Sequence, residues 1–233
     1  METITEIHRQ DIGMTRTVHD GARSTWTRWP RAEGFRNARM SRWLDRAIAT
    51  PLFLVLAPIM VVVAAAVALE GGGAVLYEQE RLGLGGRRFR IWKFRTMIPD
   101  AERDTGPVWS ETGDRRVTRV GRFLRSTHLD ELPQILNVLR GEMRLVGPRP
   151  ERPSIAAWLD SEIRGYRSRL AVPPGITGLA QVRAGYDTSL HSVRRKLRYD
   201  LFYIRRRSLV LEVSIVVVTI RNLLRLTGEE RTR

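Results

Sequence analysis

The chain has 233 residues, 40 lysines and arginines against 25 aspartates and glutamates, and a formal net charge of +15. This length accommodates one domain, or one domain with an appendage, and excludes two large domains. The absence of cysteine excludes disulfide frameworks, thiolate metal sites and thiol nucleophiles. Only Lys93 and Lys196 are lysines, and arginine binds phosphate through a planar fork. The charge therefore favours phosphate-rich partners, although a high-GC coding sequence would also produce it.

Residues 1–40 are predicted to form a polar N-terminal tail, because charged residues, glycine and threonine occur there without a sustained period. Trp26 and Trp29 lie near arginines, a combination that suits a membrane surface. The same residues would also fit a segment that folds back onto the domain. The sequence leaves both possibilities open.

An apolar segment follows, and Pro51–Leu69 contains no charge. A helix from Trp43 would reach roughly 40 Å at about 1.5 Å per residue, which is enough to cross a bilayer. Pro58 lies near its middle, where proline removes a backbone hydrogen bond and bends the helix. Basic residues flank both ends, and the positive-inside rule would keep both on the cytoplasmic side. We therefore predict a kinked, re-entrant membrane helix over residues 41–70, with a single span as the alternative.

Residues 71–226 are predicted to form a cytoplasmic domain that begins with a β-hairpin. Two extended runs, Ala74–Gln79 and Phe89–Arg95, surround a glycine-rich turn. In a regular strand Lys93 and Arg95 share one face, because side chains alternate with period two. We expect that face to meet substrate phosphates or lipid headgroups.

The next feature is an adjacent pair of acids, Asp130 and Glu131, that follows a basic run over Arg115–Arg125. Thr127 and Asp130 match the spacing of a capping box, so the pair could simply cap a helix. Pro133 is tolerated only in a first helical turn, which predicts a helix that begins near Asp130. Anions also bind at such an end. Capping and catalysis are both compatible with this stretch taken alone.

A proline-rich segment favours catalysis. Pro148 and Pro150 enclose Arg149, and prolines fix their own φ while pushing their predecessors into extended conformations. Arg149 is therefore expected on a stiffened backbone. A structural turn does not require arginine at this position, whereas a phosphate clamp does.

The remainder predicts helices and one loop. Pro153–Leu170 reads as a helix with an apolar face, and Asp187–Arg207 as a polar helix. Thr177 to Val182 is predicted to be a loop, in which Gln181 either contacts a nucleobase or sugar hydroxyl or satisfies the loop backbone. The apolar run from Leu209 to Leu226 carries too many charges for a span, so it is expected to pack on the domain or lie along the membrane interface. Residues 227–233 are predicted to be a C-terminal tail.

The chain resembles the bacterial sugar transferases, the monotopic phosphoglycosyl transferases, in its exopolysaccharide-type members, from about Ser41 to Leu226. The resemblance rests on ordered motifs: Lys93-Phe94-Arg95-Thr96-Met97, Arg115 to Arg125, Leu129-Asp130-Glu131-Leu132-Pro133-Gln134, Gly147-Pro148-Arg149-Pro150-Glu151 and Pro174 to Val182. The family commonly has a Ser-Pro pair at its helix break, whereas this chain has Ala57-Pro58. That difference concerns the kink angle.

The resemblance implies transfer of sugar-1-phosphate from a UDP-sugar to undecaprenyl phosphate, with release of UMP. It implies that Asp130 is the nucleophile of a phosphosugar-enzyme intermediate, that Glu131 assists, and that Mg²⁺ binds at Asp130. Arg125 and Arg149 are then active-site residues. Lys93, Arg95, Pro148, Pro150, Thr177 and Gln181 complete the expected substrate-binding set.

The expected fold is therefore α+β and mostly helical: a monotopic domain with a re-entrant kinked helix, a β-hairpin and interfacial amphipathic helices. The expected location is the cytoplasmic face of the bacterial inner membrane, where lipids are partners and nucleic acid is not; a homo-oligomer is possible. A non-catalytic membrane scaffold and a membrane-anchored nucleic-acid-binding regulator are the alternatives. The sequence has no nucleic-acid-binding motif.

Overall fold

The computed structural model describes residues 38–99, 101, 114–184 and 189–229. The predictions for the tail over residues 1–37, for most of the polar loop before Asp114 and for the chain after Glu229 lie outside these residues. The described part is mostly helical with two small sheets, which confirms the α+β class.

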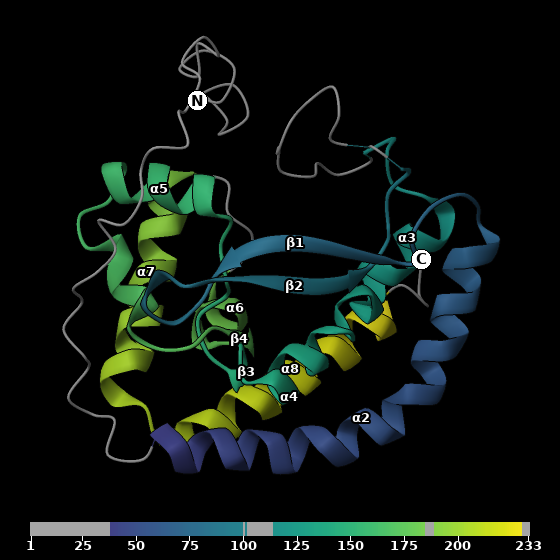
Figure 1. The fold of residues 1–233 in the computed structure, drawn as a ribbon. Helices are drawn as coiled ribbons and strands as arrows, with labels where there is room; N and C mark the ends of the chain where they lie inside the picture. The colour runs from purple at the N-terminus through teal and green to yellow at the C-terminus, as the bar shows by residue number, and fades with distance from the viewer. Residues whose placement is uncertain (1–37, 100, 102–113, 185–188, 230–233) are drawn as a thin grey trace, which may run out of the picture.

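The longest element is α2 (Ala38–Leu69), which contains Pro51 and Pro58 and stays helical through both. Its axis bends, so that its first arm runs along the base of the molecule and its second arm rises beside the rest of the fold (Figure 1). The predicted bend is confirmed. The stretch Arg42–Leu69 is long and apolar enough to cross a membrane, and little of it is buried within the protein.

The predicted hairpin is also confirmed. β1 (Leu76–Leu82) pairs antiparallel with β2 (Arg88–Phe94), and the pairing sets Tyr77 opposite Lys93. The short 3-10 turn η1 (Leu84–Gly86) joins the strands, and its Gly85 has a φ of 64°. Glycine adopts this left-handed conformation without the penalty that a side chain would incur.

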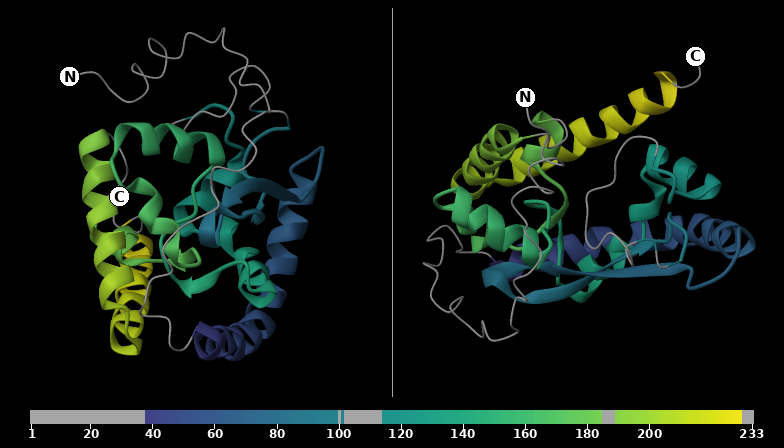
Figure 2. Two further views of the ribbon diagram at one scale, coloured as in Figure 1. Left: turned by 60° about the vertical axis from the view of Figure 1, so that its left-hand side comes forward. Right: turned by 90° about the horizontal axis from the view of Figure 1, so that it is seen from above.

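Beyond the hairpin the chain has two short parallel strands and a series of helices, of which the last two are the longest. The elements are α3 (Arg119–Thr127), η2 (Leu129–Glu131), α4 (Gln134–Arg140), β3 (Arg144–Val146), α5 (Pro153–Glu162), η3 (Tyr166–Ala171), β4 (Gly175–Thr177), α6 (Leu179–Arg183), α7 (Leu190–Arg206) and α8 (Leu209–Glu229). Figure 2 shows α8 on the side of the molecule away from the hairpin.

The helix predicted to begin near Asp130 begins later. Asp130 lies in the turn η2, and α4 starts at Gln134 with Pro133 as its N-cap residue. The capping box at Thr127 is wrong, because Thr127 is the last residue of α3 and its hydroxyl donates to the carbonyl of Phe123 within that helix. His128 ends α3 in a left-handed conformation, with a φ of 59°.

Other sequence boundaries also change. The helix expected over Pro153–Leu170 stops at Glu162, because Ile163 is extended and Gly165 is left-handed. The loop expected from Thr177 to Val182 contains the end of β4 and most of α6. The expected tail after residue 226 begins as helix, since α8 runs to Glu229.

A hydrophobic cluster ties the second arm of α2 to the middle of the chain. Val63 and Val67 of α2 pack with Phe94 of β2 and Leu124 of α3, and each of these side chains is at most 7% exposed. Leu129 and Leu132 pack against this cluster, and they flank the two acids in sequence. The same core therefore supports both the long helix and the acid-bearing turn.

A buried ionic cluster fixes the first arm of α2. Arg144 of β3 donates to Asp45 of α2 at 2.5 Å and to Glu212 of α8 at 3.0 Å. Tyr203 and Arg207 also donate to Glu212, at 2.9 and 2.7 Å. Charges removed from water need such partners to offset the cost of desolvation. The cluster connects α2, β3 and the two C-terminal helices, which are separated by long stretches of sequence.

The segment that follows β3 and the segment around β4 approach each other through their backbones. A β-carbon added at Gly147 would lie 2.7 Å from the carbonyl oxygen of Pro173 and 2.8 Å from the backbone nitrogen of Gly175. The N–H of Gly147 donates to the carbonyl of Thr177 at 2.8 Å, and the N–H of Gly175 donates to that of Pro148 at 3.0 Å. Glycine is required at position 147 because no space for a side chain exists between the two segments.

We predict that Gly147→Ala destabilises the protein by about 1–3 kcal/mol or more, because backbone atoms would have to move. Thermal unfolding of the detergent-solubilised protein would measure this change. Gly72→Ala is the matched control, since no atom lies within 4 Å of its added β-carbon. Equal melting temperatures for the two variants would contradict the close approach.

Candidate active site

The two acids lie on a turn between two helices. Asp130 and Glu131 form the end of η2, which α3 precedes and α4 follows. The left-handed His128 makes the reversal that separates α3 from this turn. Asp130 is buried, with 8% of its surface exposed. The turn thus places two carboxylates side by side where the chain changes direction.

Glu131 is held between two cations. Lys93 Nζ of β2 donates to Glu131 Oε1 at 2.6 Å, and Arg149 Nη2 donates to the same oxygen at 2.6 Å. Arg149 Nη1 reaches the other oxygen at 3.3 Å. Burial acts to raise the pKa of Glu131, but Arg149 and Lys93 outweigh it and hold that pKa well below its ordinary value. Glu131 is therefore a fixed anion that joins β2, the turn and the proline-rich loop.

Asp130 has a different electrostatic environment. Burial raises the pKa of Asp130 above its ordinary value, and the neighbouring charge of Glu131 adds to this rise. The positive charges of Lys93 and Arg125 act in the opposite direction. Asp130 lies in the turn η2 and not at the start of a regular helix, so a helix N-terminus does not supply positive charge at this carboxylate. The positive charge that acts on Asp130 comes from side chains, and it only partly offsets the effect of burial.

Arg125 approaches the acids from the last turn of α3. Its Nε donates to the hydroxyl oxygen of Thr96 at 2.8 Å. Burial lowers the pKa of Arg125, and Asp130 opposes this effect. The two groups therefore lie within electrostatic reach of each other. The role of Arg125 as an active-site residue stays a prediction.

Arg149 points outward from a loop that is anchored on both sides. Pro148 and Pro150 are buried, while 42% of the Arg149 side chain is exposed. The guanidinium can therefore reach a ligand while it binds Glu131. The stiff backbone that the prolines predicted is present, and further contacts reinforce it.

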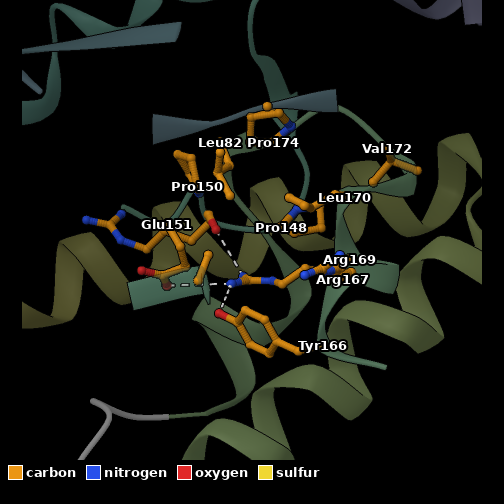
Figure 3. Close-up of a pocket in the computed structure, with 13 residues that line it drawn as sticks. Leu82, Pro148, Pro150, Glu151, Tyr166, Arg167, Arg169, Leu170, Val172 and Pro174 are labelled. Atoms are coloured by element: carbon orange, nitrogen blue, oxygen red, sulfur yellow. Dashed lines mark hydrogen bonds and ion pairs between the residues drawn. The ribbon is translucent and has the colours of Figure 1, made fainter. Parts of the chain in front are cut away.

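Those contacts come from two more arginines. Arg169 donates to the carbonyl of Arg149 at 2.9 Å, and Arg81 donates to the carbonyl of Pro150 at 3.0 Å. The guanidinium of Arg169 lies between Tyr166 and Glu151 (Figure 3). It also forms an ion pair with Asp200 of α7 at 2.9 Å. The buried Arg169 thus ties the loop of Arg149 to η3 and α7.

A small pocket lies behind this loop. Pro148, Pro150, Leu170 and Val172 contribute apolar walls, and Arg169 contributes charge (Figure 3). Its enclosed space is about that of one water molecule. This is too small for a nucleobase, so the pocket is an unsuitable donor site in this conformation.

Arg95 makes contacts of another kind. Its guanidinium donates to the carbonyls of Gly71 and Gly72 at 2.5 Å, and to that of Val67 at 3.0 Å. The last carbonyls of a helix lack partners within the helix, so Arg95 serves as a cap for α2. Lys93 and Arg95 do not share a target, since Lys93 binds Glu131 and Arg95 binds the end of α2. A substrate contact by Arg95 stays a prediction.

Thr177 and Gln181 also have partners within the protein. The Thr177 hydroxyl lies 2.7 Å from that of Thr219 in α8, and Gln181 Nε2 donates to the carbonyl of Ile176 at 2.9 Å. The second contact matches the backbone-satisfying role that the sequence left open for Gln181. Its Oε1 is buried without a hydrogen-bond partner in the described part of the chain. Substrate contacts by these two residues stay predictions.

Sequence reasoning missed Arg169, Asp200 and Thr96. Arginines are abundant in this chain, so no local pattern distinguishes Arg169 from its neighbours. Asp200 is 31 residues away from it, a separation that sequence spacing does not reveal. Thr96 follows Arg95 within the segment Lys93–Met97, and a hydroxyl directly after two closely spaced cations was the only local signal for it.

The site has three cations and two carboxylates: Lys93, Arg125 and Arg149 against Asp130 and Glu131. The net charge of these groups is one positive. A diphosphate with one negative charge on each phosphate would leave the site with one net negative charge, which a divalent cation would more than offset. Among the described residues no group of three or more His, Asp or Glu side chains could hold a metal ion. Mg²⁺ usually takes one or two carboxylates together with substrate phosphates, so Asp130 with a bound diphosphate would fit.

Comparison with known proteins gives a consistent result. The family model described as "Bacterial sugar transferase" matches residues 36–226. The chain is 45% identical over 181 residues to a UDP-N-acetylgalactosamine-undecaprenyl-phosphate N-acetylgalactosaminephosphotransferase of Aeromonas hydrophila, covering 78% of this chain and 42% of the relative.

Two further relatives extend the comparison. A UDP-glucose:undecaprenyl-phosphate glucose-1-phosphate transferase of Caulobacter vibrioides is 43% identical over 187 residues, which are 78% of this chain and 69% of that protein. The exopolysaccharide production protein PSS of Rhizobium leguminosarum bv. phaseoli is 36% identical over 186 residues, which are 78% and 93% of the two chains. The chain thus spans about two-fifths of the length of some relatives and nearly all of another. The acid pair, the clamping arginine and the match over most of the chain lead to one conclusion: this protein belongs to the bacterial sugar transferase family.

Proposed function

We propose that this protein transfers sugar-1-phosphate from a UDP-sugar to undecaprenyl phosphate and releases UMP, as an initiating step of exopolysaccharide, capsule or O-antigen assembly. One observation carries the proposal: a buried Asp130 lies beside a Glu131 that Lys93 and Arg149 hold. The names of the relatives support this chemistry. They differ in the sugar, so the proposal does not specify it.

In the first half-reaction a carboxylate oxygen of Asp130 attacks the phosphorus that bears the sugar. A new bond forms between this oxygen and phosphorus, the bond to the bridging oxygen breaks, and UMP leaves with that oxygen. Nucleophilic catalysis divides one difficult step into two easier ones. Arg149 and Arg125 would bind the phosphate oxygens through charge-assisted hydrogen bonds.

In the second half-reaction a phosphate oxygen of undecaprenyl phosphate attacks the same phosphorus. The aspartyl bond breaks, Asp130 returns as a carboxylate, and the lipid carries a diphosphate-linked sugar. Glu131 would assist by keeping Lys93 and Arg149 in place in both steps. Positioned charges of this kind stabilise a transition state without reorganising during the reaction.

Mg²⁺ is the proposed cofactor, with Asp130 as its protein ligand. When bound, this ion would neutralise charge on the diphosphate oxygens of the donor. Lys93 and Arg149 are already shared with Glu131, which leaves limited positive charge for a diphosphate.

We also propose that the domain is monotopic and lies on the cytoplasmic face of the inner membrane. The bend in α2 and the basic residues on both sides of it favour a helix that enters and leaves on one side. α8 would lie in the interface, because one face packs on the domain while Leu209, Val213 and Val217 are more than half exposed. Glu212, which binds Arg144, keeps this helix on the domain.

Asp130→Asn is expected to lower UMP release by about 10⁴-fold or more, because an amide cannot act as the nucleophile. The measurement uses purified protein, Mg²⁺, a panel of UDP-sugars and undecaprenyl phosphate. Without acceptor, a donor labelled at the phosphate next to the sugar should label the wild-type protein but not the variant. Asp160→Asn is the matched control, since Asp160 pairs with Arg167 outside the site. Undiminished turnover in Asp130→Asn would refute the mechanism.

The pH profile of kcat/KM should show an apparent pKa on its acidic side that lies above the ordinary pKa of aspartate. Burial raises the pKa of Asp130, and only its ionised form attacks. Activity falls as the pH decreases through this pKa. Lys93→Gln removes the cation that lowers this pKa most, so the apparent pKa on the acidic side of the profile should move to higher pH.

Arg90→Gln provides the control for that profile. Arg90 lies on the same strand as Lys93, but it is exposed and pairs with Glu78 at 2.9 Å. The acidic side of the pH profile of Arg90→Gln should therefore match that of the wild type. An unchanged apparent pKa in the Lys93→Gln profile would show that Lys93 does not stabilise the ionised nucleophile.

Single-cysteine variants can test the membrane topology, because the chain has no native cysteine. Arg42→Cys and Glu80→Cys flank α2, and both should resist an impermeant periplasmic reagent in intact cells. Val217→Cys carrying an environment-sensitive fluorophore should report an apolar environment in nanodiscs. Ala157→Cys, at an exposed position of α5, should report water. Periplasmic labelling at either flank would exclude the re-entrant arrangement.

A further inference from the structure

Thr96 connects the candidate site to the end of the long helix, and nothing in the proposed chemistry assigns it a role. Its side chain is buried, with 8% of the residue exposed. Its hydroxyl oxygen accepts a hydrogen bond from Arg125 Nε at 2.8 Å. A buried hydroxyl that meets a guanidinium limits the orientations that the guanidinium can adopt.

The backbone of Thr96 also supports the helix that carries Arg125. Its carbonyl accepts a hydrogen bond from the N–H of Thr118, the N-cap residue of α3, at 3.1 Å. A β-carbon at Gly121 would lie 2.1 Å from the same carbonyl oxygen. The first turn of α3 therefore rests directly on Thr96. The distance from Thr96 to Arg125 is fixed both by this backbone contact and by the hydroxyl.

Thr96 is a neutral hydrogen-bond partner of Arg125, unlike the carboxylate that Lys93 and Arg149 contact. Those two cations share the charge of Glu131. A hydroxyl orients a guanidinium without cancelling its charge. The charge of Arg125 acts on Asp130 and opposes the rise in its pKa. The contact with Thr96 therefore suits a cation that must face a phosphate.

The residue before Thr96 binds the long helix. Arg95 donates to the carbonyls of Val67, Gly71 and Gly72 at the end of α2. Its N–H donates to the carbonyl of Val75 at 2.9 Å. Of these two adjacent residues, Arg95 thus contacts the end of α2 and Thr96 contacts Arg125. A shift of Arg95 would move the backbone to which the Thr96 hydroxyl is attached.

We propose that Thr96 is a positioning residue for Arg125, and that the pair Arg95-Thr96 sets the orientation of this guanidinium from the end of the long helix. The inference rests on the proposed function, because Arg125 is taken to bind the phosphates of the donor. It assigns a task to a threonine that touches neither acid.

Thr96→Val tests the proposal, because valine keeps the shape of threonine and cannot accept a hydrogen bond. The variant should lose roughly tenfold to a hundredfold in kcat/KM for UMP release, as expected for a lost hydrogen bond to a charged group. Thr96→Ser restores the hydroxyl and should recover most of the activity. A purely packing role would give the opposite order, since serine lacks the methyl group that valine retains.

A double-mutant cycle separates positioning from general damage. If Thr96 acts through Arg125, Thr96→Val should have almost no further effect in an Arg125→Gln background. Thr118→Val is the control substitution, because its hydroxyl caps α3 rather than contacting Arg125. Additive losses in the cycle, or wild-type kcat/KM in Thr96→Val, would overturn the proposal.

Binding of inorganic pyrophosphate with Mg²⁺, followed by thermal shift, provides a readout that does not need turnover. The stabilisation seen with wild type should decrease in Thr96→Val and return in Thr96→Ser. A wild type that releases no UMP but shows this pattern would refute the proposed function and leave the positioning role intact. Equal shifts in all variants, or no shift in the wild type, would overturn the positioning role.

Discussion

The arrangement of this site depends on the carboxylate of Glu131 and the two cations that share it. Lys93 comes from the hairpin and Arg149 from the proline-rich loop, while Glu131 comes from the turn between α3 and α4. Opposite charges in a partly buried site attract strongly, and each would be costly to leave without a partner. The contact therefore brings three separate segments to one point, and Asp130 follows because it adjoins Glu131.

The adjacent acids have different tasks because their surroundings differ. Glu131 is compensated by two cations, which hold its pKa well below the ordinary value. Burial dominates at Asp130 and raises its pKa. Two neighbouring carboxylates whose pKa values move apart are suited to separate roles. In the proposed reaction Glu131 is a permanent anchor, and Asp130 is the group that gains and loses a bond.

The support behind the site is more polar than a simple hydrophobic core. Arg169 holds the loop of Arg149, while Arg144 holds α2 against β3 and α8. Both are buried arginines with several partners. An arginine can bind several groups at once through its fork of donors, which suits elements that are short and separated in sequence. The excess of arginine therefore has a structural use in addition to any contact with phosphate.

Much of this architecture could be predicted from local sequence. The apolar run and Pro58 indicated a bent helix, glycines between extended runs indicated the hairpin, and the prolines beside Arg149 indicated a stiff loop. Each of these features depends on the covalent properties of a few neighbouring residues. The start of α4 was predicted too early, because the left-handed His128 and the turn η2 depend on packing that the sequence does not display.

The sequence by itself thus determined the candidate residues Asp130, Glu131 and Arg149, since their types and neighbours already restricted their chemistry. The tertiary structure decided which cation meets which carboxylate. In that structure Arg95 donates to the end of α2, Lys93 donates to Glu131, and Arg125 donates to the hydroxyl of Thr96. The physical reason is that ion pairs and buried hydrogen bonds depend on distances between segments that lie far apart in the chain, and those distances exist only after the segments have packed.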